Sequence, residues 1–405
     1  MKNICIYIVL LWSTFAFSQN DQLAQYYYEK GDFEKAKIGY EELLNGSPSN
    51  TQYFLRTIDC YQQLQQFDVA EKAIQARFNK YKQGVFLVEL GYNFQLQKND
   101  AKAKNYYEQA IEKIKTSPND VYGIGSSFER KVLLEYALKA YQAVMQIQPN
   151  YNFNFQIGML YGQLGQTDKM IDILLTESFS NPQNSNLIQA QLARFMNGET
   201  DTTAFKDAMR KALILKTQKD QDVFWNHYLS WFYVQQKEFG KAFIQEKAIY
   251  KREPESLMSI VNLSRFALNE NDTETAEEIL NFILLNTRDL DLLIDTNANL
   301  MQIKIDKAQE KDYGTISAKL EELLKTYEIT PFTLSLQLIQ AHFVAFNLKK
   351  TEEGKAIVKK ALELNLNDYQ RADAKMELGD ILLLEEKFNQ ALIYYSQIQL
   401  DLKND

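Results

Sequence analysis

The chain has 405 residues, a formal net charge of −8, and only 15 Gly and 6 Pro. So few helix breakers exclude a many-turned β protein and favour helices. Acidic and basic residues are mixed throughout, so no basic stripe could neutralise phosphates, and nucleic acid is excluded as a partner. The 24 Tyr and 24 Phe are spread over the whole length, as expected when each unit of a repeat supplies its own aromatic packing residues.

The first residues have the pattern of an export signal. A cationic start is followed by an apolar run over residues 4–17 and a small-residue pattern that ends at Ser18. This pattern predicts a cleaved signal peptide over residues 1–18. The run is shorter than the ~20 apolar residues that a spanning helix needs, and no later stretch reaches that length, so no transmembrane helix is expected after cleavage. A retained membrane anchor is the alternative, and Cys5 lies too early for a lipid-attachment box.

A motif near the start of the mature chain recurs at its end. The spacing from Phe33 to Ala36 matches that from Phe388 to Ala391, and similar segments lie between them. This pattern resembles the tetratricopeptide repeat family, whose repeat pairs a helix A carrying a small residue with a helix B carrying Ala and an aromatic residue. The resemblance covers nearly all of the mature chain. It implies an all-α, right-handed α-α superhelical solenoid of about eleven helix pairs, with helix A lining the inner face.

The small helix-A position has a steric cause, because two helix backbones approach closely only where a side chain is small. In eight of the eleven predicted repeats the match is strong, whereas Lys304 makes repeat nine the weakest. The predicted small positions are Ala24, Ile58, Gly91, Gly125, Gly158, Ala193, Ser230, Ser264, Lys304, His342 and Gly379. The predicted repeats are residues 17–50, 51–83, 84–117, 118–150, 151–184, 186–219, 223–256, 257–290, 297–330, 335–368 and 372–405.

The predicted last helix, residues 389–402, is apolar on more than one face. Repeat arrays normally end in a polar cap, and no further helix follows in the sequence. We therefore expect that the chain is a fragment or the leading part of a longer protein.

Catalytic chemistry has little support in the sequence. The two histidines, His227 and His342, lie three repeat periods apart, and no His or Cys pair has metal-ligand spacing. His342 is predicted to be a packed histidine with one satisfied nitrogen, and Cys60 to be a buried small apolar residue. We predict no catalytic residue, no metal and no cofactor, although a hydrolase site hidden in the irregular repeats nine and ten is a third, lesser alternative.

The resemblance implies a binding groove formed by helix A of successive repeats. Large aromatic, thioether, amide and Arg side chains at the inward positions suit a protein or peptide surface, since aromatic residues and Arg carry most interface energy. Packing between repeats is the alternative for Tyr92 and Phe155. In contrast, repeat two offers Asp59 and a Gln62 that is predicted to be solvated. Leu55 and Asp59 occupy the positions at which the family's carboxylate-clamp subclass needs basic and amide residues, so that subclass is disfavoured. The predicted protein-binding residues are Tyr92, Phe155, Met159, Gln163, Arg194, His227, Trp231 and Arg265, with Tyr122 and Arg130 beside them.

Trp231 is the predicted main anchor of this groove. It lies six residues after Trp225, so the two side chains point in different directions on one helix, and one can be core while the other faces the groove. The leading hypothesis is therefore a non-enzymatic scaffold of the bacterial cell envelope that binds a protein or peptide. Its expected location is the periplasm, with secretion or association with the outer envelope as alternatives. The sensor portion of a longer envelope signalling protein is the runner-up.

The signal peptide yields a direct prediction. The exported protein should begin at Gln19, because the small-residue pattern ends at Ser18. Intact-mass measurement of the exported protein checks this. A mass that retains Met1 would contradict cleavage and favour the membrane-anchored alternative.

Overall fold

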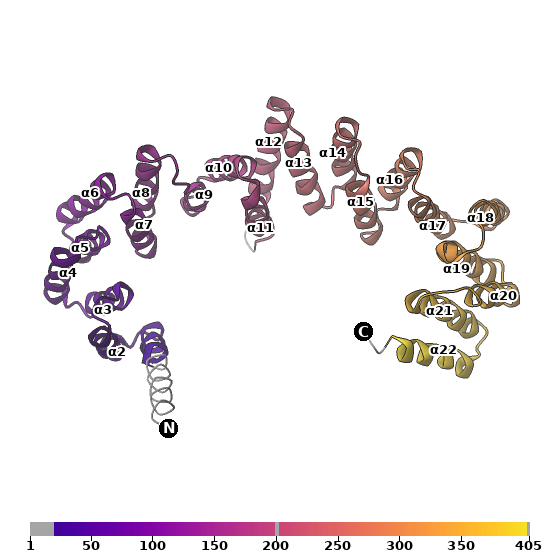
Figure 1. Ribbon diagram of the computed structural model, residues 1–405, viewed down its shortest axis with the longest axis horizontal. Helices are drawn as coiled ribbons and strands as arrows, with labels where there is room; N and C mark the ends of the chain where they lie inside the picture. Colours follow the sequence, from indigo (N-terminus) through magenta and orange to yellow (C-terminus); the bar gives the residue numbers. More distant parts are fainter. Residues whose placement is uncertain (1–19, 199–201, 403–405) are drawn as a thin grey trace, which may run out of the picture. The chain divides into compact units, whose positions relative to one another are not determined.

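The computed structural model describes residues 20–198 and 202–402, and within these ranges every regular element is a helix (Figure 1). The predicted signal peptide lies outside them. The chain divides into two compact units, with unit 1 ending at Met209 and unit 2 starting at Arg210. In the described ranges, no helix combines the length and the apolar character that a membrane crossing needs.

The helices follow one another as antiparallel neighbours joined by short turns. Unit 1 opens with helical residues 20–29. It continues with α2 (Phe33–Gly46), α3 (Thr51–Gln63), α4 (Phe67–Tyr81), α5 (Val85–Leu96), α6 (Asp100–Thr116), α7 (Asp120–Arg130), α8 (Leu134–Ile147), α9 (Asn154–Gln163), α10 (Thr167–Ser180), η1 (Pro182–Asn184) and α11 (Ser185–Met196), and α12 (Thr203–Lys219) contains the boundary between the units. Unit 2 continues with α13 (Val223–Gln235), α14 (Phe239–Arg252), α15 (Met258–Asn269), α16 (Thr273–Asn286), α17 (Leu290–Asp306), η2 (Glu310–Asp312), α18 (Tyr313–Tyr327), η3 (Pro331–Thr333), α19 (Leu334–His342), η4 (Phe343–Asn347), α20 (Thr351–Leu362), α21 (Asp368–Leu384) and α22 (Phe388–Asp401).

In several helix pairs, a tyrosine ring of the second helix packs against a glycine of the first. A Cβ atom added to Gly91 of α5 would lie 2.4 Å from the Tyr107 ring of α6, and one added to Gly125 of α7 would lie 2.5 Å from the Tyr141 ring of α8. Real Cβ atoms do not tolerate such distances, so these rings occupy the space that a larger residue would need. The all-α solenoid of tetratricopeptide-type helix pairs expected from the sequence is therefore present in the packing itself.

The turn inside the pairs also recurs. In nine predicted repeats, the residue seven positions after the small helix-A position has a positive φ. Two of the nine are glycines, for which this left-handed conformation carries no steric penalty. The others accept it because the short connection between the two helices needs it, and the branched Val132 does so at φ 58°. The nine residues are Gly31, Gln65, Lys98, Val132, Gly165, Lys237, Asn271, Lys349 and Glu386.

Two small-position assignments are wrong. In repeat nine, Lys304 is exposed while Met301 and Ile305 are buried, so the buried face of α17 is turned away from the predicted position. The cause is the extra one-turn helix η2, which lengthens the connection to α18 and shifts the register.

In repeat ten, the side chain of His342 is 42% exposed, and the neighbouring Ala341 is fully buried instead. Added Cβ atoms at Gly354 would meet the Ala341 carbonyl oxygen at 2.9 Å and the Ala345 Cβ at 2.8 Å. The π-helix Phe343–Asn347 places one extra residue in the turn, which displaces the histidine from the contact.

The last described helix has apolar residues on two faces, as expected. Ala391 and Ile398 of α22 are buried against the preceding helix, whereas Phe388, Leu392 and Ile393 are more than half exposed.

The close approach at Gly91 predicts a large effect of a single methyl group. Gly91→Ala should lower the free energy of unfolding by about 1–3 kcal/mol, because the new Cβ collides with Tyr107. Gly314→Ala in α18 is the matched control, since nothing lies within 4 Å of its added Cβ and Ala is the better helix former. Thermal unfolding of both variants measures the difference. Equal midpoints would contradict the packing described for the α5–α6 pair.

Candidate functional site

The eight residues predicted to bind a partner fall into both units of the chain. Unit 1 holds five of them and unit 2 holds three. The two groups are therefore described as separate candidate surfaces. In unit 1 these residues are Tyr92 on α5, Phe155, Met159 and Gln163 on α9, and Arg194 on α11, and in unit 2 they are His227 and Trp231 on α13 and Arg265 on α15.

The unit 1 residues differ in how much of each side chain is available. Phe155 and Met159 are half-buried, while Gln163 and Arg194 are exposed. Tyr92 is half-buried, and the Lys131 ammonium lies 4.3 Å from the centre of its ring. The ring of Tyr92 therefore takes part in internal packing and keeps some accessible surface.

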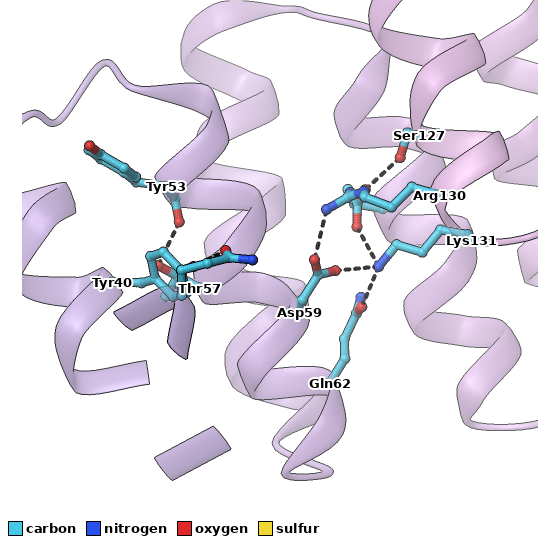
Figure 2. Close-up of polar contacts among 10 residues, drawn as sticks. Tyr40, Tyr53, Thr57, Asp59, Gln62, Ser127, Arg130 and Lys131 are labelled. Atoms are coloured by element: carbon cyan, nitrogen blue, oxygen red, sulfur yellow. Dashed lines mark hydrogen bonds and ion pairs between the residues drawn. The ribbon is translucent and has the colours of Figure 1, made fainter. Parts of the chain in front are cut away.

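A buried charge network lies next to Tyr92 and joins three helices of unit 1 (Figure 2). Arg130 donates to Asp59 at 2.7 Å and also pairs with Glu89. The Lys131 ammonium pairs with Asp59 and with Glu89, the latter at 3.2 Å. Two positive and two negative side chains therefore balance. We use the name buried charge network for Asp59 and Gln62 of α3, Glu89 of α5, Ser127 and Arg130 of α7, and the following Lys131.

Burial sets the electrostatics of this network. Glu89 is fully buried and Asp59 is 5% exposed. Burial alone would raise the pKa of Glu89, but the facing Lys131 and Arg130 hold it below its usual value. Burial would likewise lower the pKa of Lys131, yet the two carboxylates raise it. All four charges are stable only because each has partners of opposite sign.

The prediction that Gln62 is solvated is wrong, and Asp59 beside it is buried as well. Gln62 is 4% exposed and accepts a hydrogen bond from the Lys131 ammonium at 3.0 Å. Their partners lie about two repeats further along the chain, so helix periodicity within repeat two gave no indication of burial. The adjacent Arg130 and Lys131 at the end of α7 are the signal that could have suggested it, because two neighbouring cations there need carboxylates nearby.

Unit 2 separates the two tryptophans of α13. Trp225 is 3% exposed and its indole N–H donates to Asp220 at 3.0 Å, so it belongs to the core. Trp231 is half-buried and meets the Tyr228 ring edge-on at 5.4 Å between ring centres. His227 is exposed on the same helix. One tryptophan is thus core and the other retains accessible surface, as expected.

Arg265 lines a cavity of about 500 Å³ between α15 and α17. Apolar side chains form one part of its lining, and amides and carboxylates form the other. No described residue pairs with the Arg265 guanidinium or with the Asp295 carboxylate. We call this site the Arg265 cavity. Its lining includes Val261, Ile283 and Ile303 in the apolar wall, and Arg265, Asn269, Asn271, Asp295, Asn299, Gln302 and Asp306 on the polar side.

The charges in the Arg265 cavity influence each other without contact. Partial burial raises the pKa of Asp295, and Arg265 opposes that shift. The Asp306 carboxylate accepts a hydrogen bond from Gln302 at 2.8 Å. A ligand that offers both a carboxylate and a donor could therefore be bound by opposite charges within one cavity.

Sequence reasoning singled out Arg265, which lines the cavity, but it missed the α17 side. Asp295, Asn299, Gln302 and Asp306 lie four, three and four residues apart, which aligns them on one helix face. This polar stripe could have been found in the sequence. The register error at Lys304 concealed it.

His342 and Cys60, the other residues considered for chemistry, take part in internal packing. His342 Nδ1 lies 3.1 Å from Glu377, and its ring stacks on Phe346. The hydrogen bond to Glu377 raises the pKa of His342. Cys60 is fully buried, and burial raises the pKa of its thiol to about 12, so it is an inert core residue as predicted. Within residues 20–198 and 202–402, no three His, Cys, Asp or Glu side chains gather as metal ligands.

No protein-family model matches the chain, and no curated protein matches it. Among solved structures, the chain is similar to the Naa15/Naa10 complex bound to HypK-THB, with 12% identity over 96% of this chain and 64% of that one, at a TM-score of 0.32. It is similar to yeast Tom70, with 12% identity over 95% of this chain and 92% of that one, at a TM-score of 0.32. A tetratricopeptide repeat protein from Parabacteroides merdae shares 16% identity over 74% of this chain and 99% of that one, at a TM-score of 0.27. All three TM-scores lie below 0.5, so these likenesses identify neither a function nor a partner.

The buried charge network predicts a strong effect of losing one cation. Lys131→Met should lower the free energy of unfolding by about 3 kcal/mol, because Asp59 and Glu89 would share only one buried counter-charge. Lys104→Met is the control, since its side chain is 68% exposed and its pair with Glu108 spans 3.8 Å. Urea unfolding measures the free energy of unfolding of both variants. If Lys131→Met lowers this free energy no more than Lys104→Met does, the network is contradicted.

Proposed function

We propose that the chain is a non-enzymatic scaffold of the cell envelope that binds a protein or peptide through the helix-A faces of its repeats. The observation that carries this proposal is the Arg265 cavity, in which a guanidinium and a carboxylate without described partners lie among four amide side chains. The export pattern of residues 1–18 is the support for the envelope location.

The chemistry of the cavity suits a peptide in an extended conformation. A peptide backbone offers N–H and C=O groups in alternation, and each Asn or Gln side chain can satisfy one of either kind. Arg265 would bind an acidic side chain, and Asp295 a basic one. The apolar wall around Ile283 and Ile303 would accept a side chain between them. A ligand bound in this way would bury polar groups that remain paired.

Trp231 contributes accessible aromatic surface to the same unit, as expected for an interface anchor. Its ring also packs on Tyr228, so Trp231→Ala would change stability as well as binding. Arg265 is exposed and makes no ion pair with any described residue, and it therefore gives the cleaner test.

Peptides selected by phage display against the full-length chain provide the probe. Arg265→Ala should weaken their binding about tenfold, which corresponds to about 1.4 kcal/mol, while thermal stability is unchanged. Arg288→Ala is the matched control, because Arg288 is also exposed but does not line the cavity. Fluorescence polarisation measures both affinities. If selection yields no binders, or if both variants bind equally well, the cavity is not the peptide site.

A further inference from the structure

A second polar site, at the end of α10 in unit 1, has no part in the proposed function. The carboxylate of Glu177 is 1% exposed and accepts hydrogen bonds from four asparagine side chains. The donors are Asn152 at 2.9 and 3.0 Å, Asn154 at 3.0 Å, Asn181 at 3.1 Å and Asn184 at 2.8 Å. We call these five residues the Glu177 cage.

The Glu177 cage contains a buried negative charge without a counter-charge. No described Lys, Arg or His forms an ion pair with Glu177, in contrast to Glu89 of the buried charge network. Amide dipoles stabilise a carboxylate, but they leave its net charge in place. A buried charge of this kind is usually paired with a cation or coordinated to a metal.

The oxygen atoms around the cage match the preference of a hard cation. Each asparagine amide presents a carbonyl oxygen after half a turn of its terminal group. The oxygen of Asn152 already accepts the backbone N–H of Asn154 at 3.0 Å, so Asn152 stays a donor. No described donor occupies the side-chain oxygens of Asn154, Asn181 and Asn184. These three oxygens and the carboxylate give five protein ligands, and Ca²⁺ takes six to eight oxygens, waters included.

The dimensions and access of the cage also suit Ca²⁺. Oxygens that surround Ca²⁺ at about 2.4 Å with about seven ligands lie about 3 Å apart, which is close to the 2.8–3.1 Å between the amides and the carboxylate. Asn152 and Asn181 are exposed, so an ion can enter from solvent without unfolding the repeat. Mg²⁺ demands a tighter octahedron at about 2.1 Å and dehydrates reluctantly, so it should bind less well.

We propose that Glu177, Asn154, Asn181 and Asn184 form a Ca²⁺ site that joins α9, α10 and η1. A single carboxylate gives a weak site, and we expect a Kd on the order of 10⁻⁴–10⁻³ M, as in extracellular modules. The ion would add a further link between segments that already pack against one another, and it would be lost in chelator.

The test compares thermal unfolding of the full chain in chelator and in Ca²⁺. About 5 mM Ca²⁺ should raise the midpoint by about 1–3 °C, because binding to the folded state alone stabilises it. Glu177→Gln keeps the shape of the side chain and should abolish this rise. Glu246→Gln is the matched control, since Glu246 is also buried, at 6% exposed, but has no asparagine cage, and it should keep the rise. Mg²⁺ at the same concentration should raise the midpoint less than Ca²⁺ does.

Terbium luminescence gives a second readout that does not depend on unfolding. Tyr151 adjoins Asn152 in the sequence, so excitation of Tyr151 should increase the luminescence of bound Tb³⁺. Ca²⁺ should displace Tb³⁺ and lower this signal. If Glu177→Gln does not fold, Asn184→Ala replaces it and should weaken Tb³⁺ binding several-fold. The proposal is overturned if Ca²⁺ has no effect on the wild type, if the effect persists in Glu177→Gln, or if Asn184→Ala binds Tb³⁺ as tightly as the wild type. The cage would then be a purely structural set of hydrogen bonds.

Discussion

The contact between a small residue of one helix and a tyrosine ring of the next is the constraint on which the structure depends. At Gly91 and Gly125 the ring lies so close to the first helix that no other residue type fits without a shift. The contact fixes the distance within a pair, and the left-handed residue that follows fixes the turn. Together they determine which face of each first helix remains for a partner. The Arg265 cavity lies on such a face, between α15 and α17.

Features that arise within one repeat could be predicted from the sequence. Examples are the helix pairs, the burial of Cys60 and the different environments of Trp225 and Trp231. These features depend on residues a few turns apart, so they follow from hydrophobic periodicity and motif spacing. The irregular repeats were harder, because η2 and the π-helix change the register without a compositional signal. The error at Lys304 followed from this, and it hid the polar stripe from Asp295 to Asp306.

Features that join distant repeats could not be predicted. The cations that bind Asp59 lie 71 and 72 positions later in the chain, and no residue near Asp59 in the sequence indicates this contact. The Glu177 cage lies within one repeat, but its asparagines come from the two ends of the α9–α10 pair, residues 152–154 and 181–184, so helix periodicity does not reveal it. Polar residues in a helical repeat are therefore poorly described as solvated by default. Their environment depends on how successive first helices are placed, which only the folded array defines.

The buried charge network has a consequence for how this part of the chain unfolds. In an ideal solenoid each repeat contacts only its neighbours, so disorder spreads along the array one pair at a time. The network joins α3 directly to α7 across α5 and therefore adds a coupling beyond nearest neighbours. Fraying α3 alone would remove Asp59 and leave Arg130 and Lys131 with one carboxylate between them. We therefore expect the segment from α3 to α7 to unfold more cooperatively than coupling between neighbouring pairs alone would give.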